Sequence, residues 1–455
     1  MKQRIPRVML AGVSSGCGKT TLTCAILQAL VNRGHRVGAF KCGPDYIDPM
    51  FHSRIIGAKS ANLDLHFFGE NTLRYLLCKN AADRDVSVIE GVMGYYDGIG
   101  LTQRASSYEV AQVTGSPVVL VVNAKGAAAS ILATIQGFLT FLPDSHIRGV
   151  ILNQCGAMAY GPLAEEIEKK LGIRAYGYLP GMENCALESR HLGLVTAAEV
   201  ANLREKLQDM AQQAERSIDL DGLLALASGA PQVFCNPAAI ARQEAARIAV
   251  ARDRAFCFYY EDNLDAMRQM GAELVEFSPL HDKKLPEEIH GLYLGGGYPE
   301  LYAAQLSQNQ TMRESVCAAL SHGLPCIAEC GGFMYLTQEI GGYPMVGFLP
   351  GSCFDTGKLT RFGYVTLRAK ADNVLCKAGG TIAGHEFHHW DCTENGNAFL
   401  AEKPSGKQWP AVVATETLYA GFPHFHFYAN PEFVRNFYEA CRKEKYRHAG
   451  NHQTR

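Results

Sequence analysis

The chain has 455 residues, of which 47% are hydrophobic and 19% charged, and its formal net charge is −2. This length is too great for one ordinary core, so we expect two domains of a soluble globular protein. The near-neutral charge gives no basis for binding nucleic acid or an acidic membrane, and we expect neither as a partner. The 15 cysteines form no CxxC pair, which favours reduced thiols and a cytoplasmic location.

The first motif is a glycine-rich turn between a strand and a helix. An apolar run from Val8 to Val13 is typical of a buried strand, and a helical pattern begins at Lys19. Free backbone N–H groups and the positive helix end would converge at the turn, which predicts a nucleotide-phosphate site. Lys19 would approach the terminal phosphates, and the Thr20 hydroxyl would bind Mg²⁺. The residues expected to contact the nucleotide are Gly16, Gly18, Lys19, Thr20 and Thr21.

This turn departs from the strict phosphate-loop pattern at one position. That pattern has glycine where the chain has Val13, and the nearest glycine is Gly12. The spacing instead matches the variant loop of dethiobiotin-synthetase-like and partition-ATPase-like proteins.

A second loop carries two carboxylates. The segment Arg36 to Lys41 is predicted to be a strand, and it ends in the loop KCGPDYIDP with Asp45 and Asp48 three residues apart. Two carboxylates beside a phosphate site suit Mg²⁺ binding or the handling of a substrate. Capping of a turn by one or both is the alternative, and the spacing does not choose between them.

Another carboxylate follows the predicted strand Asp85 to Ile89, in the segment EGVMGYYDG. In a phosphate-loop fold a second Mg²⁺ ligand usually stands directly after a buried strand, so we favour Glu90 as a metal or phosphate-site residue. Asp97 lies seven residues later in a glycine-flanked turn. Asp97 could equally be a metal or phosphate-site residue or a residue that caps the turn.

Three further strands are predicted at residues 117–122, 148–152 and 175–179, alternating with helical patterns. This alternation predicts an α/β fold with a parallel, doubly wound sheet that binds ligands at the carboxyl ends of its strands. Asn123 and Asn153 stand at two such ends. They could contact a nucleotide base or form turns.

A change in composition divides the chain. Residues 197–226 are amphipathic and mostly helical, and small residues and prolines follow. We therefore expect a domain at 1–228, a linker at 229–246, a second domain at 247–440 and a mobile C-terminal tail at 441–455.

The second half contains a cysteine at an abrupt strand-to-helix turn, in LPCIAECGGFMYL. A nucleophile on such a corner needs small neighbours, and Ala328, Gly331 and Gly332 surround Cys330. The following helix N-terminus is expected to lower the thiol pKa and to offer backbone donors for an oxyanion. Cys330 is therefore the predicted nucleophile.

A nucleophilic thiol needs a base, and GFPHFHFYANP offers His424 and His426. Alternation with phenylalanine would place both on one face of a strand, so either could reach Cys330. A second histidine cluster, GHEFHHW at 384–390, looks like a strand, which disfavours the helical H-E-x-x-H metal site.

Backbone donors for the oxyanion are expected from glycines. The segment LYLGGGYPE places Gly296 and Gly297 at a strand end, and Gly331 follows the nucleophile. We predict that these three glycines face the reacting carbonyl.

Together these motifs resemble the cobyrinate a,c-diamide synthase family, from Val8 to Pro431. The segments that carry the resemblance, in chain order, are FKCGPDYIDP, EGVMGYYDG, FSPLHDKKLP, YLGGGYPELY and GHEFHHW. The first half is similar to dethiobiotin synthetase, and the second resembles the class I glutamine amidotransferase fold of the cobyric acid synthase type.

The resemblance implies an enzyme that uses ATP, Mg²⁺ and glutamine to amidate two carboxylates of cobyrinate or a related tetrapyrrole. It implies that Asp45, Asp48 and Glu90 join Thr20 in binding Mg²⁺ and positioning the reacting carboxylate. It further implies that Cys330 attacks the glutamine amide with help from the late histidine. The residues implied to contact the substrate are Lys41, Tyr46, Ile47 and Asp97.

Three alternatives are weaker. A stand-alone amidase with a vestigial nucleotide site conflicts with the intact Lys19, Thr20 and Glu90. A nickel-sirohydrochlorin a,c-diamide synthase would use the same two domains, and no residue distinguishes its substrate. A partition-ATPase-like nucleotide switch would need a basic or membrane-targeting surface, and it leaves Cys330 unexplained. A homodimer is left open.

Overall fold

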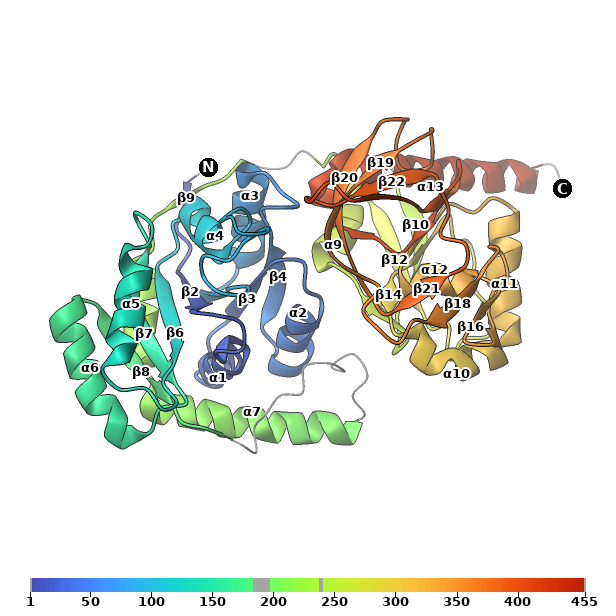
Figure 1. Cartoon of the computed structure of the whole chain (residues 1–455). Coiled ribbons are helices and arrows are strands. Elements are labelled where there is room, and N and C mark those ends of the chain that lie inside the picture. Colours follow the sequence, from blue (N-terminus) through green and yellow to red (C-terminus); the bar gives the residue numbers. More distant parts are fainter. Residues whose placement is uncertain (1, 183–196, 237–239, 454–455) are drawn as a thin grey trace. The chain divides into compact units, whose positions relative to one another are not determined.

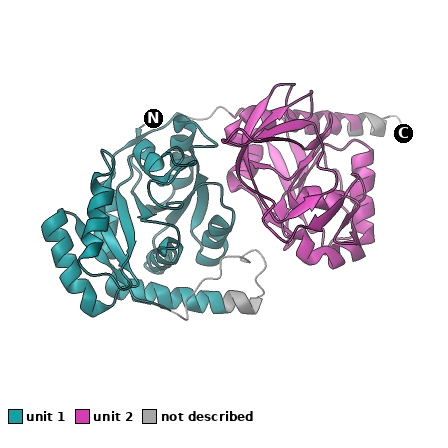
Figure 2. Cartoon of the chain, in the orientation of Figure 1, with its two compact units in different colours: residues 1–238 teal, residues 239–455 magenta. Residues whose placement is uncertain are grey.

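The structure is a computed structural model that describes residues 2–182, 197–236 and 240–453. The chain forms two compact units, residues 1–238 and residues 239–455 (Figure 2). Each contains a sheet of mainly parallel strands connected by helices, which confirms the predicted α/β class. The division falls within the range 229–246 that was expected to be a linker.

Unit 1 is built on seven parallel strands in the order β4-β3-β5-β2-β6-β7-β8 (Figure 1). These strands are β2 (Arg7–Gly12), β3 (Val37–Cys42), β4 (Lys59–Leu63), β5 (Val86–Glu90), β6 (Val118–Asn123), β7 (Ile147–Asn153) and β8 (Arg174–Leu179). The helices are α1 (Lys19–Asn32), α2 (Ile47–Phe51), the π-helix η1 (His52–Ile56), α3 (Glu70–Ala81), α4 (Ser107–Thr114), α5 (Ser130–Thr140), α6 (Ala157–Leu171), α7 (Ala197–Ser217) and α8 (Leu220–Ser228).

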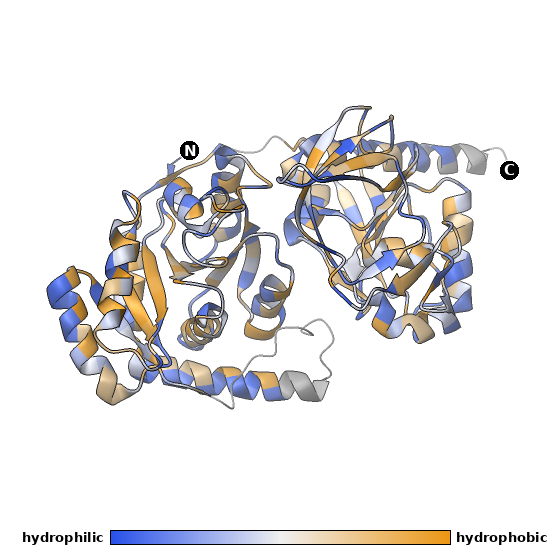
Figure 3. Cartoon of the chain, in the orientation of Figure 1, coloured by the Kyte–Doolittle hydropathy of each residue, from blue (hydrophilic) through white to orange (hydrophobic). Residues whose placement is uncertain are grey.

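The apolar runs of the sequence become the centre of this sheet. All residues of β2, β3 and β5 are buried, and Figure 3 shows β6 and β7 coloured hydrophobic. Strands buried on both faces read as continuous apolar runs, which is why they could be predicted. Strand β4 was not predicted, because KSANL lacks such a run. The carboxyl ends of β2, β3 and β5 carry the loops that were expected to bind phosphate and metal.

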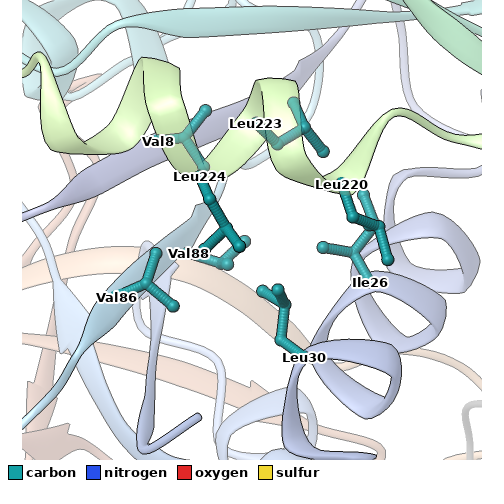
Figure 4. Close-up of a pocket in the computed structure, with 8 residues that line it drawn as sticks. All are labelled: Val8, Ile26, Leu30, Val86, Val88, Leu220, Leu223 and Leu224. Atoms are coloured by element: carbon teal, nitrogen blue, oxygen red, sulfur yellow. The ribbon is translucent and has the colours of Figure 1, made fainter. Parts of the chain in front are cut away.

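Helices α1, α7 and α8 contribute to one apolar core against β2, β5 and β6. A small void lies inside this core, and only aliphatic side chains line it (Figure 4). They are Val8, Ile26, Leu30, Val86, Val88, Leu220, Leu223 and Leu224. Because no polar group faces the void, it is a packing gap and not a site for a charged ligand.

The expected linker is partly ordered. Strand β9 (Val233–Phe234) pairs antiparallel with β1 (Lys2–Gln3), and β10 already begins at Ala246. The small-residue composition of this range therefore did not reveal strand β9 or the first residue of strand β10. Residues 237–239 of the expected linker lie outside the described residues.

Unit 2 has a six-stranded sheet in the order β12-β10-β13-β15-β25-β24, parallel except for the pair β24 and β25. Its strands are β10 (Ala246–Ala251), β12 (Ala272–Phe277), β13 (Gly291–Leu294), β15 (Cys326–Glu329), β24 (Val413–Ala414) and β25 (Leu418–Gly421). Smaller sheets contain β11 (Phe256–Phe258), β14 (Gly296–Gly297), β16 (Glu339–Ile340), β17 (Tyr343–Pro344), β18 (Ser352–Asp355), β19 (Arg361–Ala369), β20 (Thr381–His388), β21 (Trp390–Cys392), β22 (Phe399–Glu402), β23 (Gln408–Ala411) and β26 (His424–Phe425). The helices are α9 (Glu261–Met270), η3 (Pro299–Tyr302), α10 (Ala303–Gln308), α11 (Gln310–Ser321), α12 (Gly331–Leu336), η4 (Phe427–Ala429) and α13 (Pro431–Gln453).

The range 441–455, which was expected to be a mobile tail, is helical as far as the structure describes it. Helix α13 continues to Gln453, and Cys441 and Glu444 are buried. Arg442 contacts Glu244, and Lys445 donates to the Ala245 carbonyl oxygen at 2.9 Å. The basic residues that suggested a solvated end instead fasten the helix to the start of the unit.

Within the described residues, no helix combines the length and the hydrophobicity needed to cross a bilayer. The described cysteines are all free thiols, in agreement with the expectation from their scatter.

Candidate active sites

The predicted phosphate loop lies between β2 and α1. Gly18 has φ +96°, a left-handed conformation that glycine adopts readily, and it is the N-cap of α1. Lys19 Nζ donates to the carbonyl oxygens of Ser14 at 3.0 Å and Met93 at 2.5 Å. A Cβ atom on Gly12 would lie 2.4 Å from Cys17 Sγ and 2.9 Å from this Nζ, so a side chain there would force both side chains to shift.

The carboxylate of Glu90 is the centre of the unit 1 site. Glu90 is fully buried, and its Oε1 accepts hydrogen bonds from Thr20 Oγ1 and Lys41 Nζ, both at 2.7 Å. Lys41 Nζ also lies 2.5 Å from Asp48 Oδ2. Burial lowers the Lys41 pKa, but Glu90 and Asp48 outweigh it, so the net shift is upward and the ammonium stays charged.

Asp45 forms an Asx turn just before the short helix α2. Its Oδ1 accepts the Ile47 N–H at 3.1 Å, and its Oδ2 accepts the Asp48 N–H at 3.2 Å. The capping alternative is therefore confirmed for Asp45, whereas Asp48 pairs with Lys41. Burial raises the pKa of Asp45 to about 7, and the neighbouring Asp48 carboxylate adds to this shift.

The remaining predicted residues of unit 1 lie around this centre. Asp97 Oδ2 accepts the Gly94 N–H at 2.9 Å. Burial lowers the pKa of Lys19, and the negative charge of Asp97 offsets part of that shift. Tyr46 is buried, and Ile47 is half-buried at the start of α2. Within the loop and α1, Gly16 is exposed and Thr21 is half-buried.

The two asparagines have different surroundings. Asn123 Oδ1 accepts the Lys125 N–H at 2.9 Å, which confirms the turn alternative for Asn123. Asn153 Nδ2 instead donates to the Cys17 carbonyl oxygen at 2.9 Å and supports the phosphate loop from β7.

His52 completes the unit 1 cluster and was missed from the sequence. It is fully buried in the first position of the π-helix η1, and its Nε2 lies 3.7 Å from Glu90 Oε2. Burial lowers its pKa, so the ring is neutral at physiological pH. Its spacing of four residues from Asp48 places both on one helical face, and this spacing was the available signal.

The three carboxylates do not converge on one point, because the Lys41 ammonium lies between Asp48 and Glu90. Within the described ranges, no three His, Cys, Asp or Glu side chains gather closely enough to hold a metal ion. Glu90 Oε2 nevertheless is buried without a hydrogen-bond partner, and such an oxygen suits a cation. A Mg²⁺ ion commonly takes only one or two protein carboxylates and completes its shell with phosphate oxygens and water.

In unit 2, Cys330 stands at the corner between β15 and α12 with φ +49°, a strained conformation for a residue with a side chain. A Cβ atom on Gly332 would overlap the Leu294 carbonyl oxygen, so the corner needs glycine. This geometry agrees with the predicted nucleophile turn.

The expected lowering of the thiol pKa is wrong for this arrangement. Burial raises the pKa of Cys330, and the nearby Glu300 carboxylate raises it further. The Gly331 N–H favours the thiolate, but its effect is smaller than that of burial. The thiol is therefore protonated at neutral pH and needs a base to remove its proton.

His424 and His426 have different surroundings. Strand β26 ends at Phe425, so the expectation that one strand face carries both is wrong. His424 lies in β26 with its Nδ1 3.6 Å from Glu329 Oε2, and its ring stacks on His385 with centroids 5.3 Å apart. His426 is the N-cap of η4, and its Nδ1 accepts the Tyr428 N–H at 3.2 Å.

The glycines at the end of β13 connect the nucleophile to His424. A Cβ atom on Gly296 would lie 3.3 Å from His424 Nε2, and one on Gly331 would lie 3.2 Å from the Gly297 backbone nitrogen. The predicted base, the predicted backbone donors and the residue after the nucleophile are therefore neighbours.

The second histidine cluster lies on β20, a strand as predicted. Glu386 Oε2 is 3.4 Å from His388 Nε2 and 3.8 Å from Arg361 Nε. Glu386 and His388 are buried and form polar contacts beside His424. No metal trio forms there among the residues that the structure describes.

Glu329 was missed from the sequence, and His385 was considered only as part of the segment GHEFHHW. Both are buried and both contact the His424 ring. A buried carboxylate at the end of a parallel strand was the available signal for Glu329, since charged side chains are rarely buried without a partner.

Comparisons with known proteins cover both units. Residues 8–195 match a family model described as the CobQ/CobB/MinD/ParA nucleotide binding domain, and residues 247–432 match the CobB/CobQ-like glutamine amidotransferase domain. The chain is 41% identical to the cobyrinate a,c-diamide synthase of Caldanaerobacter subterraneus over 95% of its length and 98% of the relative's. It is 39% identical to the synthase of Priestia megaterium, covering 96% and 98%, and 40% identical to that of Listeria innocua, covering 96% and 100%.

Proposed function

Because the chain belongs to the cobyrinate a,c-diamide synthase family, we propose that it amidates the a- and c-acetate carboxylates of cobyrinate with ATP and glutamine. The observation that carries this proposal is the presence of two different sites in one chain. Unit 1 has a phosphate loop beside a buried lysine and carboxylate cluster, and unit 2 has a cysteine at a strained corner. Phosphoryl transfer needs the first site, and release of ammonia from glutamine needs the second.

Activation of the carboxylate is the role of unit 1. A carboxylate does not react with ammonia at neutral pH, because hydroxide is a poor leaving group. Transfer of the ATP γ-phosphoryl group to the carboxylate oxygen forms an acyl phosphate, and ammonia then displaces phosphate. Lys19 would leave its carbonyl partners Ser14 and Met93 to hold the phosphates. The backbone of Gly16 and Gly18 and the hydroxyl of Thr21 would complete the cradle.

Thr20 Oγ1 and Glu90 are the donors that fit Mg²⁺ best, because Glu90 Oε2 is buried without a hydrogen bond. Asp48 would be a further oxygen donor, while Asp45 holds the loop that presents it. When bound, Mg²⁺ would offset the negative charge of the phosphates and the carboxylate.

The carboxylate substrate would lie over the loop that follows β3. Lys41 would attract it, and Tyr46 and Ile47 directly precede Asp48, which pairs with that lysine. Asp97 lies close enough to Lys19 to influence its charge. We propose that the choice between the two acetate groups depends on Tyr46 and Ile47.

Release of ammonia is the role of unit 2. Cys330 would give its proton to His424, and its sulfur would attack the amide carbon of glutamine. Backbone N–H groups of Gly296, Gly297 and Gly331 would stabilise the oxyanion. The C–N bond then breaks, the leaving nitrogen takes the proton as ammonia, and water hydrolyses the thioester to glutamate. His424 fits the role of base better than His426, whose Nδ1 already accepts a backbone N–H.

The test compares the wild type with Cys330→Ala, using cobyrinic acid, ATP and either glutamine or ammonium. We expect the variant to lose glutamine-driven amidation and to keep ammonia-driven amidation. Product masses should show OH replaced by NH₂ twice, with ATP consumed for each replacement. If the wild type leaves cobyrinic acid unchanged with both nitrogen sources, the corrin assignment fails, and nickel-sirohydrochlorin is the next substrate to test.

A further inference from the structure

Glu329, the residue immediately before the nucleophile, contacts the proposed base. Glu329 Oε2 lies 3.6 Å from His424 Nδ1, and both side chains are almost completely buried. The same oxygen accepts a hydrogen bond from the Tyr293 hydroxyl at 3.3 Å. Glu329 lies on β15, and its two partners come from other strands: Tyr293, fully buried, from β13 and His424 from β26. Its position is therefore fixed by packing.

We propose that Glu329 is the positioning residue that orients His424 for proton transfer from Cys330. This inference rests on the proposed glutamine hydrolysis and extends it by one residue. A carboxylate facing Nδ1 favours the tautomer that carries its proton there and leaves Nε2 free to accept one. His424 Nε2 lies on the side of Gly296, where the backbone donors for the oxyanion are expected.

Other charged groups face the His424 ring. Glu386 and His388 influence its charge, and His385 stacks on it. Glu386 Oε2 already lies near His388 Nε2 and Arg361 Nε, at 3.4 and 3.8 Å. By contrast, among the described residues His424 is the basic side chain that pairs with Glu329. Glu329 is therefore better placed than Glu386 to orient the ring.

Glu329 would act in both halves of the reaction. When the Cys330 proton moves to Nε2, the imidazolium forms inside a buried site, and the adjacent carboxylate stabilises it. The imidazolium then returns the proton to the leaving nitrogen, and the ring becomes neutral again. Burial raises the Glu329 pKa to about 8, so the ionised fraction that can orient His424 increases as the pH rises toward and above 8. In those molecules Glu329 neither gains nor loses a proton in these steps. A distance of 3.6 Å is longer than a hydrogen bond, and such contacts commonly shorten when substrate binds.

The experiment measures glutamine hydrolysis by the full chain, which needs no tetrapyrrole. For Glu329→Gln we expect kcat to fall by roughly 10²–10⁴-fold, because the amide can favour the wrong tautomer. The KM for glutamine should stay near that of the wild type, since Glu329 is not placed against the substrate. Glu329→Asp, which keeps the charge, should recover part of kcat. The rate at which iodoacetamide alkylates Cys330, measured from peptide masses, should fall in each variant by a factor similar to the fall in kcat.

Two controls separate a positioning role from a structural one. Glu444→Gln changes another buried carboxylate of unit 2, which pairs with Arg447, and it should leave kcat unchanged. Ammonia-driven amidation by Glu329→Gln should equal that of the wild type. The proposal is overturned if Glu329→Gln keeps the wild-type kcat, or if Gln and Asp variants lose hydrolysis, ammonia-driven amidation and thermal stability together. Failure of cobyrinate amidation by the wild type would count against the proposed function and would leave the hydrolysis result intact.

Discussion

Lys41 and Glu90 form a buried ion pair, with 2.7 Å between Nζ and Oε1, at the carboxyl ends of the neighbouring strands β3 and β5. The side chains are 9% and 0% exposed, so water screens their attraction very little. Because the same Oε1 accepts the Thr20 hydroxyl, this pair connects the phosphate loop to the loop that carries Asp48.

Lys41→Met should destabilise unit 1 by roughly 3–5 kcal/mol, because it leaves two buried carboxylates without their cation. The loss should shrink when Glu90→Gln is added, since one of those charges is then removed. Urea unfolding would measure both effects. Arg36→Met breaks an exposed pair with Asp85 and should cost less than about 1 kcal/mol. Equal costs for the two single variants would contradict the importance of the buried pair.

Thr20→Val should reduce amidation at least about 10-fold with glutamine and with ammonium alike, because it removes an oxygen proposed for Mg²⁺. Glutamine hydrolysis should continue, since Cys330 belongs to the other unit. Thr23→Val removes a hydroxyl of the same helix that makes no hydrogen bond, and it should keep both activities. Retained amidation in Thr20→Val would remove Thr20 from the site.

His424→Asn should reduce glutamine-driven amidation by about 10²–10⁴-fold and leave ammonia-driven amidation intact. His426→Asn should keep most of the glutamine-driven rate, because an asparagine side chain can still accept the Tyr428 N–H. Initial rates with each nitrogen source would distinguish them. The reverse ranking of the two variants would assign the base to His426.

The Glu329 carboxyl should also make stability depend on pH. Burial raises its pKa to about 8 from an ordinary 4.5, so the folded state keeps a proton that the unfolded chain releases. This contribution is complete below about pH 4.5 and is lost as the pH rises through about 8, with an upper limit of about 5 kcal/mol. Unfolding midpoints at pH 5 and pH 8.5 should therefore differ less for Glu329→Gln than for the wild type. An unchanged difference would mean that another group titrates in this window.

The sequence predicted those features that depend on neighbouring residues. Apolar runs identified β2, β5 and β6, and glycines beside Lys19 and Cys330 identified the two corners, because local backbone requirements select these residues. The family resemblance placed Thr20 with Glu90, but the ion pair with Lys41 and the contact with His52 were not predicted, since these residues come from separate elements. Contacts between distant segments leave no spacing in the sequence.

The same reason explains the errors in unit 2. The alternation around Phe425 predicted one strand face for His424 and His426, but η4 begins at once and ends the strand. The thiol pKa was expected to follow the helix end alone, whereas burial from several elements has the larger effect. Glu329 was overlooked because its partner His424 lies far along the chain.

Gly332→Ala should disrupt the nucleophile corner, because its Cβ would overlap the backbone oxygen of Leu294 on the neighbouring strand β13. Backbone cannot move aside as a flexible side chain can, so we expect a cost of about 1–3 kcal/mol or more. Gly137→Ala provides the matched control, since Gly137 is exposed within helix α5 and nothing lies within 4 Å of its added Cβ. That variant should gain roughly 0.5–1 kcal/mol from the lower entropy of its unfolded chain. Thermal unfolding would measure both, and a Gly332→Ala protein as stable as the wild type would show that the corner tolerates a side chain.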